Sequence, residues 1–269
     1  MKEYYENKVA CVTGGASGIG LALCELLLSL GARAVILADL SAENLKKETA
    51  RLEAAYPGKV LGIRTDVTKQ ESVVSMIRQG AEFGGGQIHF LFNNAGLGLS
   101  KSFDEATDAD WKFAFDINFF GPLYGIRAVL PIMRAQRGGH IANTASGVGF
   151  MAQPLQSMYS ATKSALIALT CSLRAELWDE NIRLSTVIPG AVATPIWDQL
   201  GGKLPSFVIT PEECARGVLK GLAENERIVI ITDYDCEAGI NAFRPDHARG
   251  LDEHLLDVAR KRKRGEIAF

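Results

Sequence analysis

The sequence predicts a single doubly wound α/β domain, and two of its features support this prediction. Short apolar runs rich in β-branched residues alternate with helix-length segments from the first residues to about residue 190. Strands that are apolar throughout are typical of a parallel sheet covered by helices on both faces, and right-handed crossovers make that sheet doubly wound. No linker, repeat or low-complexity block divides the chain, so residues 1–269 are expected to form one domain.

Each element follows from its own pattern. The first strand is expected at Lys8–Thr13, and the next helix covers Gly18–Leu30, where apolar residues recur at helical spacing before Gly31 ends the helix. Strand Arg227–Thr232 brings the mainly parallel sheet to about seven strands, and a helix is expected near 251–263. The remaining strands are expected at Ala34–Asp39, Val60–Asp66, Ile88–Phe92, His140–Ala145 and Ile182–Ile188, with helices over about 42–56, 69–83, 108–135 and 157–179.

Composition argues against several classes of protein. The net charge is −2, from 29 basic and 31 acidic residues, so no general basic face is expected against the phosphates of a nucleic acid. The five cysteines form no Cys-x-x-Cys pair and the four histidines show no metal-ligand spacing, so neither a disulfide framework nor a metal site is expected. The chain has no apolar signal core and no stretch of the roughly 20 apolar residues that span a bilayer. A cytoplasmic protein without a membrane span is therefore expected.

The first strand runs through the glycine-rich segment Thr13–Gly20 directly into a helix. Gly14 and Gly18 let the backbone approach a pyrophosphate closely. Ser17, Gly18 and Ile19 lie where the start of the helix offers free N–H groups and the positive end of its dipole. Glycines also occur in turns for conformation alone, but their place between the first strand and the first helix favours a bound dinucleotide.

Two acidic residues end the next two strands. Asp39 lies 19 residues after Gly20, where a carboxylate can accept hydrogen bonds from the ribose hydroxyls of NAD and would repel the 2′-phosphate of NADP. Neither Ser17 nor Leu40 supplies a cation for that phosphate, so NAD is the expected cofactor; the alternative is a solvated loop aspartate. Asp66 is expected either to bond the adenine amino group or to cap the following helix.

Tyr159 and Lys163 lie four residues apart in a predicted helix, so both side chains project from one face. Ser146 follows the fifth strand, at the carboxyl edge of the sheet where doubly wound folds bind their ligands. A lone Tyr-x-x-x-Lys pair carries little weight. Here it is accompanied, in order along the chain, by Thr13-Gly14-x-x-x-Gly18-Ile19-Gly20, Asn93-Asn94-Ala95-Gly96, Asn118 and Pro189-Gly190.

Over roughly residues 7–195 this combination resembles the short-chain dehydrogenase/reductase family of Rossmann-fold oxidoreductases, with no departure at the motif positions. The resemblance implies that Tyr159 is the general acid/base, and that Ser146 holds the substrate oxygen. It implies that Lys163 binds the nicotinamide ribose and that Asn118 supports a water-linked proton relay through it. The other cofactor-binding residues that it implies are Asp66, Val67, Asn93, Gly96, Pro189, Gly190, Val192 and Thr194.

The residue types suit this chemistry. A free tyrosine has a pKa near 10 and is a poor base at neutral pH. An ammonium group nearby and the positive nicotinamide ring are expected to lower the pKa of Tyr159. In oxidation the tyrosinate would accept the alcohol proton; in reduction the tyrosine would donate it while Ser146 stabilises the developing alkoxide.

Two apolar segments are expected to shape the substrate site. They are Gly147–Met158 and residues about 195–211, which form a mobile flap in the family. Their few charges favour a hydrophobic alcohol or ketone, such as a steroid, bile acid or cyclic alcohol. The alternative is that these segments pack against the core or a partner subunit.

The expected assembly is a homodimer or homotetramer. The aromatic-rich helix 108–135 is expected to be buried on both sides, and it belongs to the region that forms a dimer interface in the family. The segment 233–269 lacks the Asp-Gly-Gly ending of many tetrameric members, which favours a dimer or a segment covering its own active site. Its basic run Arg260–Arg264 is expected to be a solvated helix end. Asp233 and Asp235 are too few for a cation site.

Three functions compete at this point. The leading one is an NAD-dependent enzyme that interconverts a secondary alcohol and a ketone. The second is a 3-oxoacyl thioester reductase, which Asp39 disfavours because reductive biosynthesis in the family usually uses NADPH. The third is a non-catalytic sensor that binds the dinucleotide; the intact set of Asn118, Ser146, Tyr159 and Lys163 argues against it.

Overall fold

The computed structural model describes residues 1–199, 208–242, 244 and 246–266. Within them, seven parallel strands form one sheet: β1 (Val9–Thr13), β2 (Ala34–Asp39), β3 (Val60–Arg64), β4 (Phe90–Asn93), β5 (Gly139–Thr144), β6 (Ile182–Ile188) and β7 (Ile228–Ile230). Their order across the sheet is β3-β2-β1-β4-β5-β6-β7. The predicted single Rossmann-like α/β domain with a sheet of about seven strands is confirmed.

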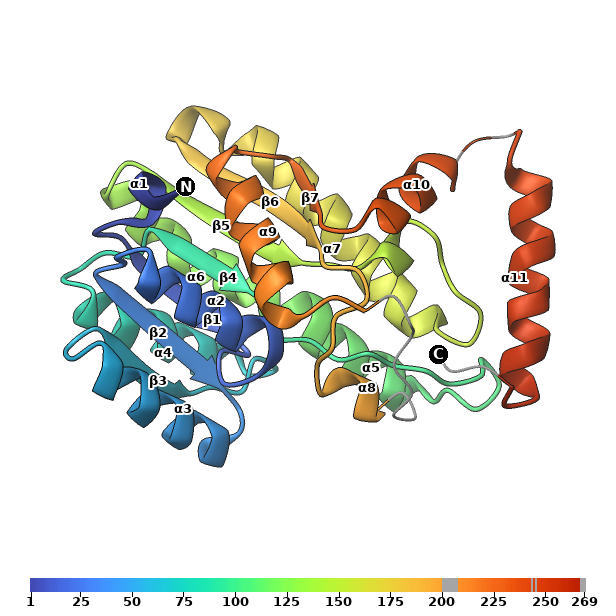
Figure 1. Ribbon diagram of the computed structural model, residues 1–269, viewed down its shortest axis with the longest axis horizontal. Helices are drawn as coiled ribbons and strands as arrows, with labels where there is room; N and C mark the ends of the chain where they lie inside the picture. Colours follow the sequence, from blue (N-terminus) through green and yellow to red (C-terminus); the bar gives the residue numbers. More distant parts are fainter. Residues whose placement is uncertain (200–207, 243, 245, 267–269) are drawn as a thin grey trace.

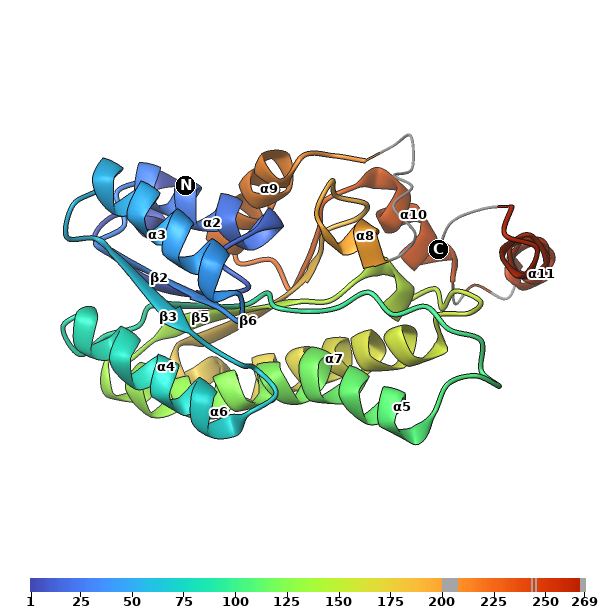
Figure 2. The same cartoon turned by 90° about the horizontal axis from the view of Figure 1, so that it is seen from below.

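Helices cover both faces of the sheet (Figures 1 and 2). One face carries α2 (Gly18–Ser29), α3 (Ala42–Ala55) and α9 (Pro211–Ala223). The other carries α4 (Gln70–Phe83), α5 (Asp108–Phe115), α6 (Gly121–Ala135) and α7 (Ser157–Glu176). The described chain also contains α1 (Lys2–Tyr5), α8 (Ile196–Gln199), α10 (Asp233–Asn241) and α11 (Ala248–Lys263). No helix in these described ranges is long and apolar enough to cross a membrane.

The position of β1 between β2 and β4 sets the place of the ligand crevice. The chain winds outward from β1 to β3 in one direction and from β4 to β7 in the other. Thr13 pairs with Ala38 across β1 and β2, and Val12 pairs with Phe92 across β1 and β4, so the carboxyl ends of the central strands are aligned. A crevice opens outside the carboxyl ends where the winding reverses.

The core is divided by the sheet into two apolar layers. Successive residues of a strand point to opposite faces, and β1 accordingly places Ala10 and Val12 in one layer and Val9 and Cys11 in the other. All four side chains are almost fully buried. A sheet buried on both faces explains why its strands are apolar at every position rather than at alternate ones.

The predicted helix 108–135 is confirmed in its bounds, but it is not uniform. Asp116–Phe120 form a π-helical turn between α5 and α6. Such a turn accommodates one additional residue within a helix, and here it carries the buried Asn118. Within the single chain Phe113 is 49% exposed and Phe120 is 37% exposed, so the expected burial on both sides would require a partner subunit.

Three helices in the second half of the chain, α8, α9 and α10, were not predicted. At α9, Thr210 accepts a hydrogen bond from Glu213 N and Glu213 bonds back to Thr210 N, with Pro211 in the first turn. This capping box was visible in the sequence. At α10 the corresponding signal is a single hydrogen bond at the start of the helix. Asp235 N donates to Thr232 Oγ1 over 3.3 Å.

The N-terminal helix α1 is fastened to the amino edge of the sheet. Tyr5 is fully buried, its ring centroid lies 4.9 Å from that of Phe90, and its hydroxyl donates to Leu219 O over 2.6 Å. Tyr4 Oη lies 2.9 Å from His140 Nδ1. Burial lowers the pKa of His140 to about 3, so this histidine is neutral and structural.

Replacement of Tyr5 tests this attachment. Tyr5→Ala is expected to lower the free energy of unfolding by about 3–5 kcal/mol, because it opens a cavity and leaves Leu219 O without its donor. Denaturant unfolding measures the change. Phe103→Ala, at a side chain that is 71% exposed, is the control and should change stability by less than about 0.5 kcal/mol. Equal effects in the two variants would contradict the role given to Tyr5.

Candidate active site

The hydroxyl of Thr13 joins the carboxyl ends of β1 and β4. Thr13 Oγ1 donates to Phe92 O over 3.3 Å and accepts from the backbone N–H groups of Asn94 and Ala95, both over 3.0 Å. Asn94 Nδ2 returns a bond to Thr13 O over 3.1 Å. The sequence motifs contained both residues, but only the structure reveals that they lock the two loops of the crevice together.

The glycine-rich loop depends on missing side chains at two places. A Cβ built on Gly20 would overlap the carbonyl oxygen of Gly14, so the start of α2 can pack on the loop only with glycine there. Gly18 has a φ of +50°, a conformation that side chains disfavour, and a Cβ there would lie 3.0 Å from Thr194 Cγ2. Thr194 in the loop after β6 therefore lies beside the loop after β1.

Asp39 is held at the rim of this loop. Its carboxylate accepts from Ala16 N over 3.1 Å and from Ser41 N over 2.9 Å, so both oxygens are engaged by the backbone. The half-buried side chain is thus oriented toward the glycine-rich loop rather than lying free in solvent. This is the side of the crevice where a ribose would be expected.

Asp66 closes a turn before α4. Its Oδ1 accepts from Thr68 N over 2.9 Å and from Thr68 Oγ1 over 2.7 Å, while Lys69 is the residue that immediately precedes the helix. The expected helix cap is therefore wrong in position, because Asp66 bonds the turn and not the first N–H groups of α4. The neighbouring Val67 packs against the start of α6, where a Cβ on Gly121 would lie 3.1 Å from Val67 Cβ.

Asn118 ties the π-helical turn to the loop after β4. The side chain is fully buried; its Oδ1 accepts from Leu97 N over 3.0 Å, and its Nδ2 donates to Leu97 O over 3.1 Å and to Thr162 Oγ1 over 3.3 Å. A Cβ on Gly96 would lie 3.1 Å from Asn118 Oδ1 and 3.4 Å from Lys163 Nζ. Gly96, Asn118 and Lys163 are thus brought together from three separate segments.

Asn93 lies beneath the crevice. It is 3% exposed, and its Nδ2 donates to Asn143 Oδ1 over 2.8 Å and to Pro122 O over 3.3 Å. Asn143 in turn donates to Thr170 Oγ1 over 2.9 Å. The side chain of Asn93 therefore joins β4 to β5 and α6, which was not expected from the motif alone.

Tyr159 and Lys163 project from the first turns of α7 toward the end of β5. Lys163 Nζ donates to Thr144 O over 2.8 Å and lies 5.7 Å from the centroid of the Tyr159 ring. Ser146, two residues beyond Thr144, accepts from Val148 N over 3.4 Å and hydrogen-bonds with Tyr159. The structure thus brings Ser146, Tyr159 and Lys163 together.

Burial governs the pKa values of this pair. It lowers the pKa of Lys163 from 10.5 to about 8, and it raises the pKa of Tyr159, an effect that the hydrogen bond with Ser146 opposes. The expected lowering of the pKa of Tyr159 by Lys163 is not found, because burial raises it and the hydrogen bond with Ser146 is what opposes the rise. The lysine ammonium donates to the backbone oxygen of Thr144 instead.

The loop after β6 bounds the other side of the crevice. Pro189 is followed by Gly190, whose φ is +76°, and the buried Val192 pairs with Ile209 in a short parallel bridge. Trp197 Nε1 donates to Val192 O over 2.8 Å. Of the expected flap, Leu200, Leu204 and Phe207 lie outside the described residues.

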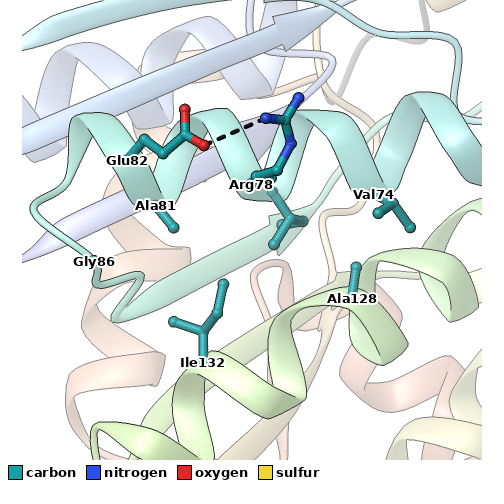
Figure 3. A pocket seen from close by; sticks show the side chains of 8 residues that line it. Val74, Arg78, Ala81, Glu82, Gly86, Ala128 and Ile132 are labelled. Carbon is teal, nitrogen blue, oxygen red and sulfur yellow. Dashed lines mark hydrogen bonds and ion pairs between the residues drawn. The ribbon is translucent and has the colours of Figure 1, made fainter.

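A separate apolar groove lies between α4 and α6 (Figure 3). Its rim carries an ion pair of 3.4 Å between Arg78 and Glu82. It contains none of the predicted site residues, so the chemistry-bearing groups belong to the carboxyl edge of the sheet. The groove is lined by Val74, Ile77, Arg78, Ala81, Glu82, Gly86, Ala128 and Ile132.

Comparison with known proteins identifies the family. The sequence profile of the short chain dehydrogenase family matches residues 8–204. An uncharacterized oxidoreductase of Staphylococcus saprophyticus is 37% identical over 232 residues, covering 82% of this chain and 92% of the relative. A 3-oxoacyl-[acyl-carrier-protein] reductase of Thermotoga maritima is 33% identical over 223 residues, covering 80% and 89%. The chain belongs to the short-chain dehydrogenase family and is an oxidoreductase of that family.

Solved structures agree with this family assignment. A short-chain dehydrogenase/reductase of Burkholderia phymatum in complex with NAD has a TM-score of 0.84 at 28% identity, covering 91% of this chain and 95% of that one. A short chain dehydrogenase of Burkholderia cenocepacia in complex with NADP has a TM-score of 0.78 at 30% identity, covering 91% and 98%. Structural relatives of this chain thus bind either nucleotide.

The burial of Lys163 predicts a measurable cost to stability. Between pH 8 and 10.5 the unfolded lysine keeps its proton while the folded one has lost it, so the unfolding free energy of the wild type rises with pH in this window. Below pH 8 both states are charged and the desolvation penalty is fully present. Lys163→Met is therefore expected to be more stable than the wild type at pH 7, by about 1–3 kcal/mol.

Denaturant unfolding of the ligand-free protein at pH 7 and at pH 10 measures this difference. The advantage of Lys163→Met should shrink at the higher pH. Lys46→Met, at an exposed position of α3, serves as the matched control. A destabilised Lys163→Met at pH 7 would show that the lysine supports the fold rather than straining it.

Proposed function

We propose that this chain is an NAD-dependent dehydrogenase that interconverts a secondary alcohol and a ketone. The observation that carries the proposal is the convergence of Ser146, Tyr159 and Lys163 at the carboxyl edge of the sheet, with Asn118 behind them. A proton-transferring hydroxyl, a second hydroxyl and a buried cation beside a dinucleotide crevice are what alcohol oxidation requires.

The residues present fit a dinucleotide. Gly14 lies against Ala95 in the loop after β4, and Gly18 lies against Thr194 in the loop after β6. The absence of side chains at these glycines leaves backbone N–H groups at the start of α2. Ser17 and Ile19 flank the same helix start, and Gly96, Gly190 and Val192 border the inner end of the crevice. When bound, the nicotinamide would supply the hydride acceptor or donor.

The chain's own residues then handle the proton. In oxidation Tyr159 Oη accepts the proton of the substrate hydroxyl, while Ser146 Oγ donates a hydrogen bond to the same oxygen. Lys163 holds a positive charge near Tyr159 and orients the ribose through its ammonium. Asn118 keeps the loop after β4 in place and supports water that returns the proton through Lys163 to solvent.

Replacement of Tyr159 tests this mechanism. Tyr159→Phe keeps the ring and its packing but removes the proton-transferring hydroxyl, so turnover is expected to fall by about 10²–10⁴-fold. The absorbance of reduced nicotinamide in the presence of secondary alcohols measures turnover, and quenching of intrinsic fluorescence by NADH measures binding. Binding should persist within a few fold. Retained turnover would contradict the mechanism, and NADH binding without turnover of any alcohol or ketone by the wild type would favour the sensor.

The choice of NAD rests on Asp39. Its carboxylate lies against the glycine-rich loop, where the 2′-phosphate of NADP would meet a negative charge. Asp39→Asn is expected to raise the ratio of kcat/KM with NADP to that with NAD by about tenfold or more, because the repulsion is removed. Ser41→Ala, two residues along the same loop, is the control. A wild type that prefers NADP would contradict the assignment.

The substrate is proposed to be hydrophobic, of the steroid, bile acid or cyclic alcohol type. Phe150 and Met151 in the loop after Ser146, and Ile196 and Trp197 in the proposed flap, are apolar and partly exposed. A 3-oxoacyl thioester reductase is the second candidate, favoured by the similarity to the Thermotoga maritima reductase. Turnover of a 3-oxoacyl thioester with a reduced nicotinamide cofactor, and of no simple alcohol, would decide for it.

The proposed assembly is a homodimer or homotetramer in the cytoplasm. Phe113 and Phe120 expose aromatic surface at α5 and the following π-helical turn, a region where a second copy would bury it. The segment after β7, with α10 and α11, is proposed as a C-terminal extension that borders the active site.

A further inference from the structure

Helix α10 lies against the loop that carries Ser146. It begins just beyond β7 and runs past the carboxyl end of β6 (Figure 1). A Cβ on Gly239 would lie 3.4 Å from Phe150 Cδ2, and a Cβ on Gly147 would overlap Asp235 Oδ1. The carboxylate of Asp235 is therefore in contact with the residue that directly follows Ser146.

The same carboxylate also touches the opposite wall of the crevice. A Cβ on Gly190 would lie 2.9 Å from Asp235 Oδ2 and 2.5 Å from Thr232 Cγ2. Gly190 needs glycine for its positive φ, whereas Gly147 has no such conformational requirement. The space beside Gly147 is instead occupied by Asp235. The side chain of Asp235 in α10 thus fills the space that a side chain at position 147 would need.

One oxygen of Asp235 is satisfied and the other is not. Thr232 Oγ1 hydrogen-bonds with Oδ2, and Asp235 N bonds back to Thr232 Oγ1 over 3.3 Å. Within the part of the chain that the structure describes, no donor bonds Oδ1. Burial raises the pKa of this carboxyl, the Thr232 hydroxyl opposes the rise, and no cation contributes. Oδ1 of this partly buried carboxylate therefore remains able to accept a hydrogen bond from a ligand.

We propose that Asp235 is a specificity-determining residue whose Oδ1 accepts a hydrogen bond from a second hydroxyl of the substrate, remote from the reacting carbon. The inference rests on the proposed alcohol dehydrogenase function and narrows its substrate class to apolar alcohols or ketones with one further hydroxyl. A hydroxyl suits the site because the neutral hydroxyl of Thr232 already bonds the other oxygen. The apolar walls of the same site would discriminate poorly on their own, whereas a hydrogen bond to a carboxylate oxygen favours substrates that carry the donor.

The experiment compares matched pairs of secondary alcohols that differ by one added hydroxyl, with NAD and NADP each supplied. Cyclohexanol with trans-1,4-cyclohexanediol is one pair, and 3-hydroxysteroids with and without a hydroxyl at the far ring extend the distance. In the wild type, kcat/KM should be about 10- to 100-fold higher for the dihydroxy member of at least one pair. Asp235→Ala should bring this ratio close to one while changing kcat/KM for the monohydroxy member by less than about threefold.

Two further variants keep the result interpretable. Asp235→Asn retains an acceptor and a partner for Thr232, so it should fold as the wild type does and keep part of the preference. Asp233→Ala changes an exposed carboxylate at the start of the same helix and should leave the ratio unchanged.

The outcomes separate the role proposed for Asp235 from the dehydrogenase function on which it rests. A wild type that oxidises alcohols without preferring the dihydroxy member of any pair overturns the role of Asp235 but leaves the dehydrogenase function intact. An equal loss for both members in Asp235→Ala and Asp235→Asn also overturns it, since it indicates support of the Ser146 loop. No turnover of any alcohol or ketone overturns the proposed function and this inference with it.

Discussion

A single buried hydroxyl, that of Thr13, holds the ligand edge of this domain together. It binds the strand that precedes the glycine-rich loop to the loop that follows β4. The parallel register brings the strand ends to one edge, and the Thr13 bonds prevent the loops there from separating. The other polar contacts of the edge build outward from this point: Asn93 bonds Asn143, and Asn118 bonds Leu97. Buried polar groups of this kind stabilise one arrangement only when all are paired.

Burial opposes the charged forms that the proposed chemistry uses. Burial disfavours the charged forms of both Tyr159 and Lys163, yet the proposed mechanism needs an ammonium and a tyrosinate in the same place. The hydrogen bond from Lys163 to Thr144 O offsets part of the cost of burying the ammonium. A bound positive nicotinamide would favour the tyrosinate further. Such local conflicts with stability are expected at functional sites.

Periodicity was enough to predict the layers of the fold. The spacing of apolar residues indicates which faces of the strands and helices are buried. Together with the alternation of strands and helices along the chain, it predicts a sheet covered by helices on both faces. The π-helical turn at Asp116–Phe120 was not predicted, because the aromatic residues around it lie on more than one helix face and conceal the shift in apolar spacing that one extra residue produces. The exposure of Phe113 and Phe120 also escaped prediction, since aromatic content reports burial without saying whether the chain itself or a partner provides it.

The candidate site was predictable where residues are linked by short spacing or ordered motifs. Tyr159 and Lys163 share a helix face, and Ser146 follows a neighbouring strand, so elementary geometry brings them close. Asp235 was not predictable as part of this edge. Its place beside Gly147 depends on how the chain returns after β7, and no local pattern encodes a contact between elements so far apart in sequence.

The transfer of a labelled hydride tests the central proposal most directly. A secondary alcohol carrying deuterium on its carbinol carbon is incubated with the protein and NAD, and the reduced cofactor is examined by mass spectrometry. The proposed function predicts one deuterium in each reduced nicotinamide formed and a ketone product without it. Reduced cofactor without the label, or binding of the nucleotide without any reduction, would contradict it.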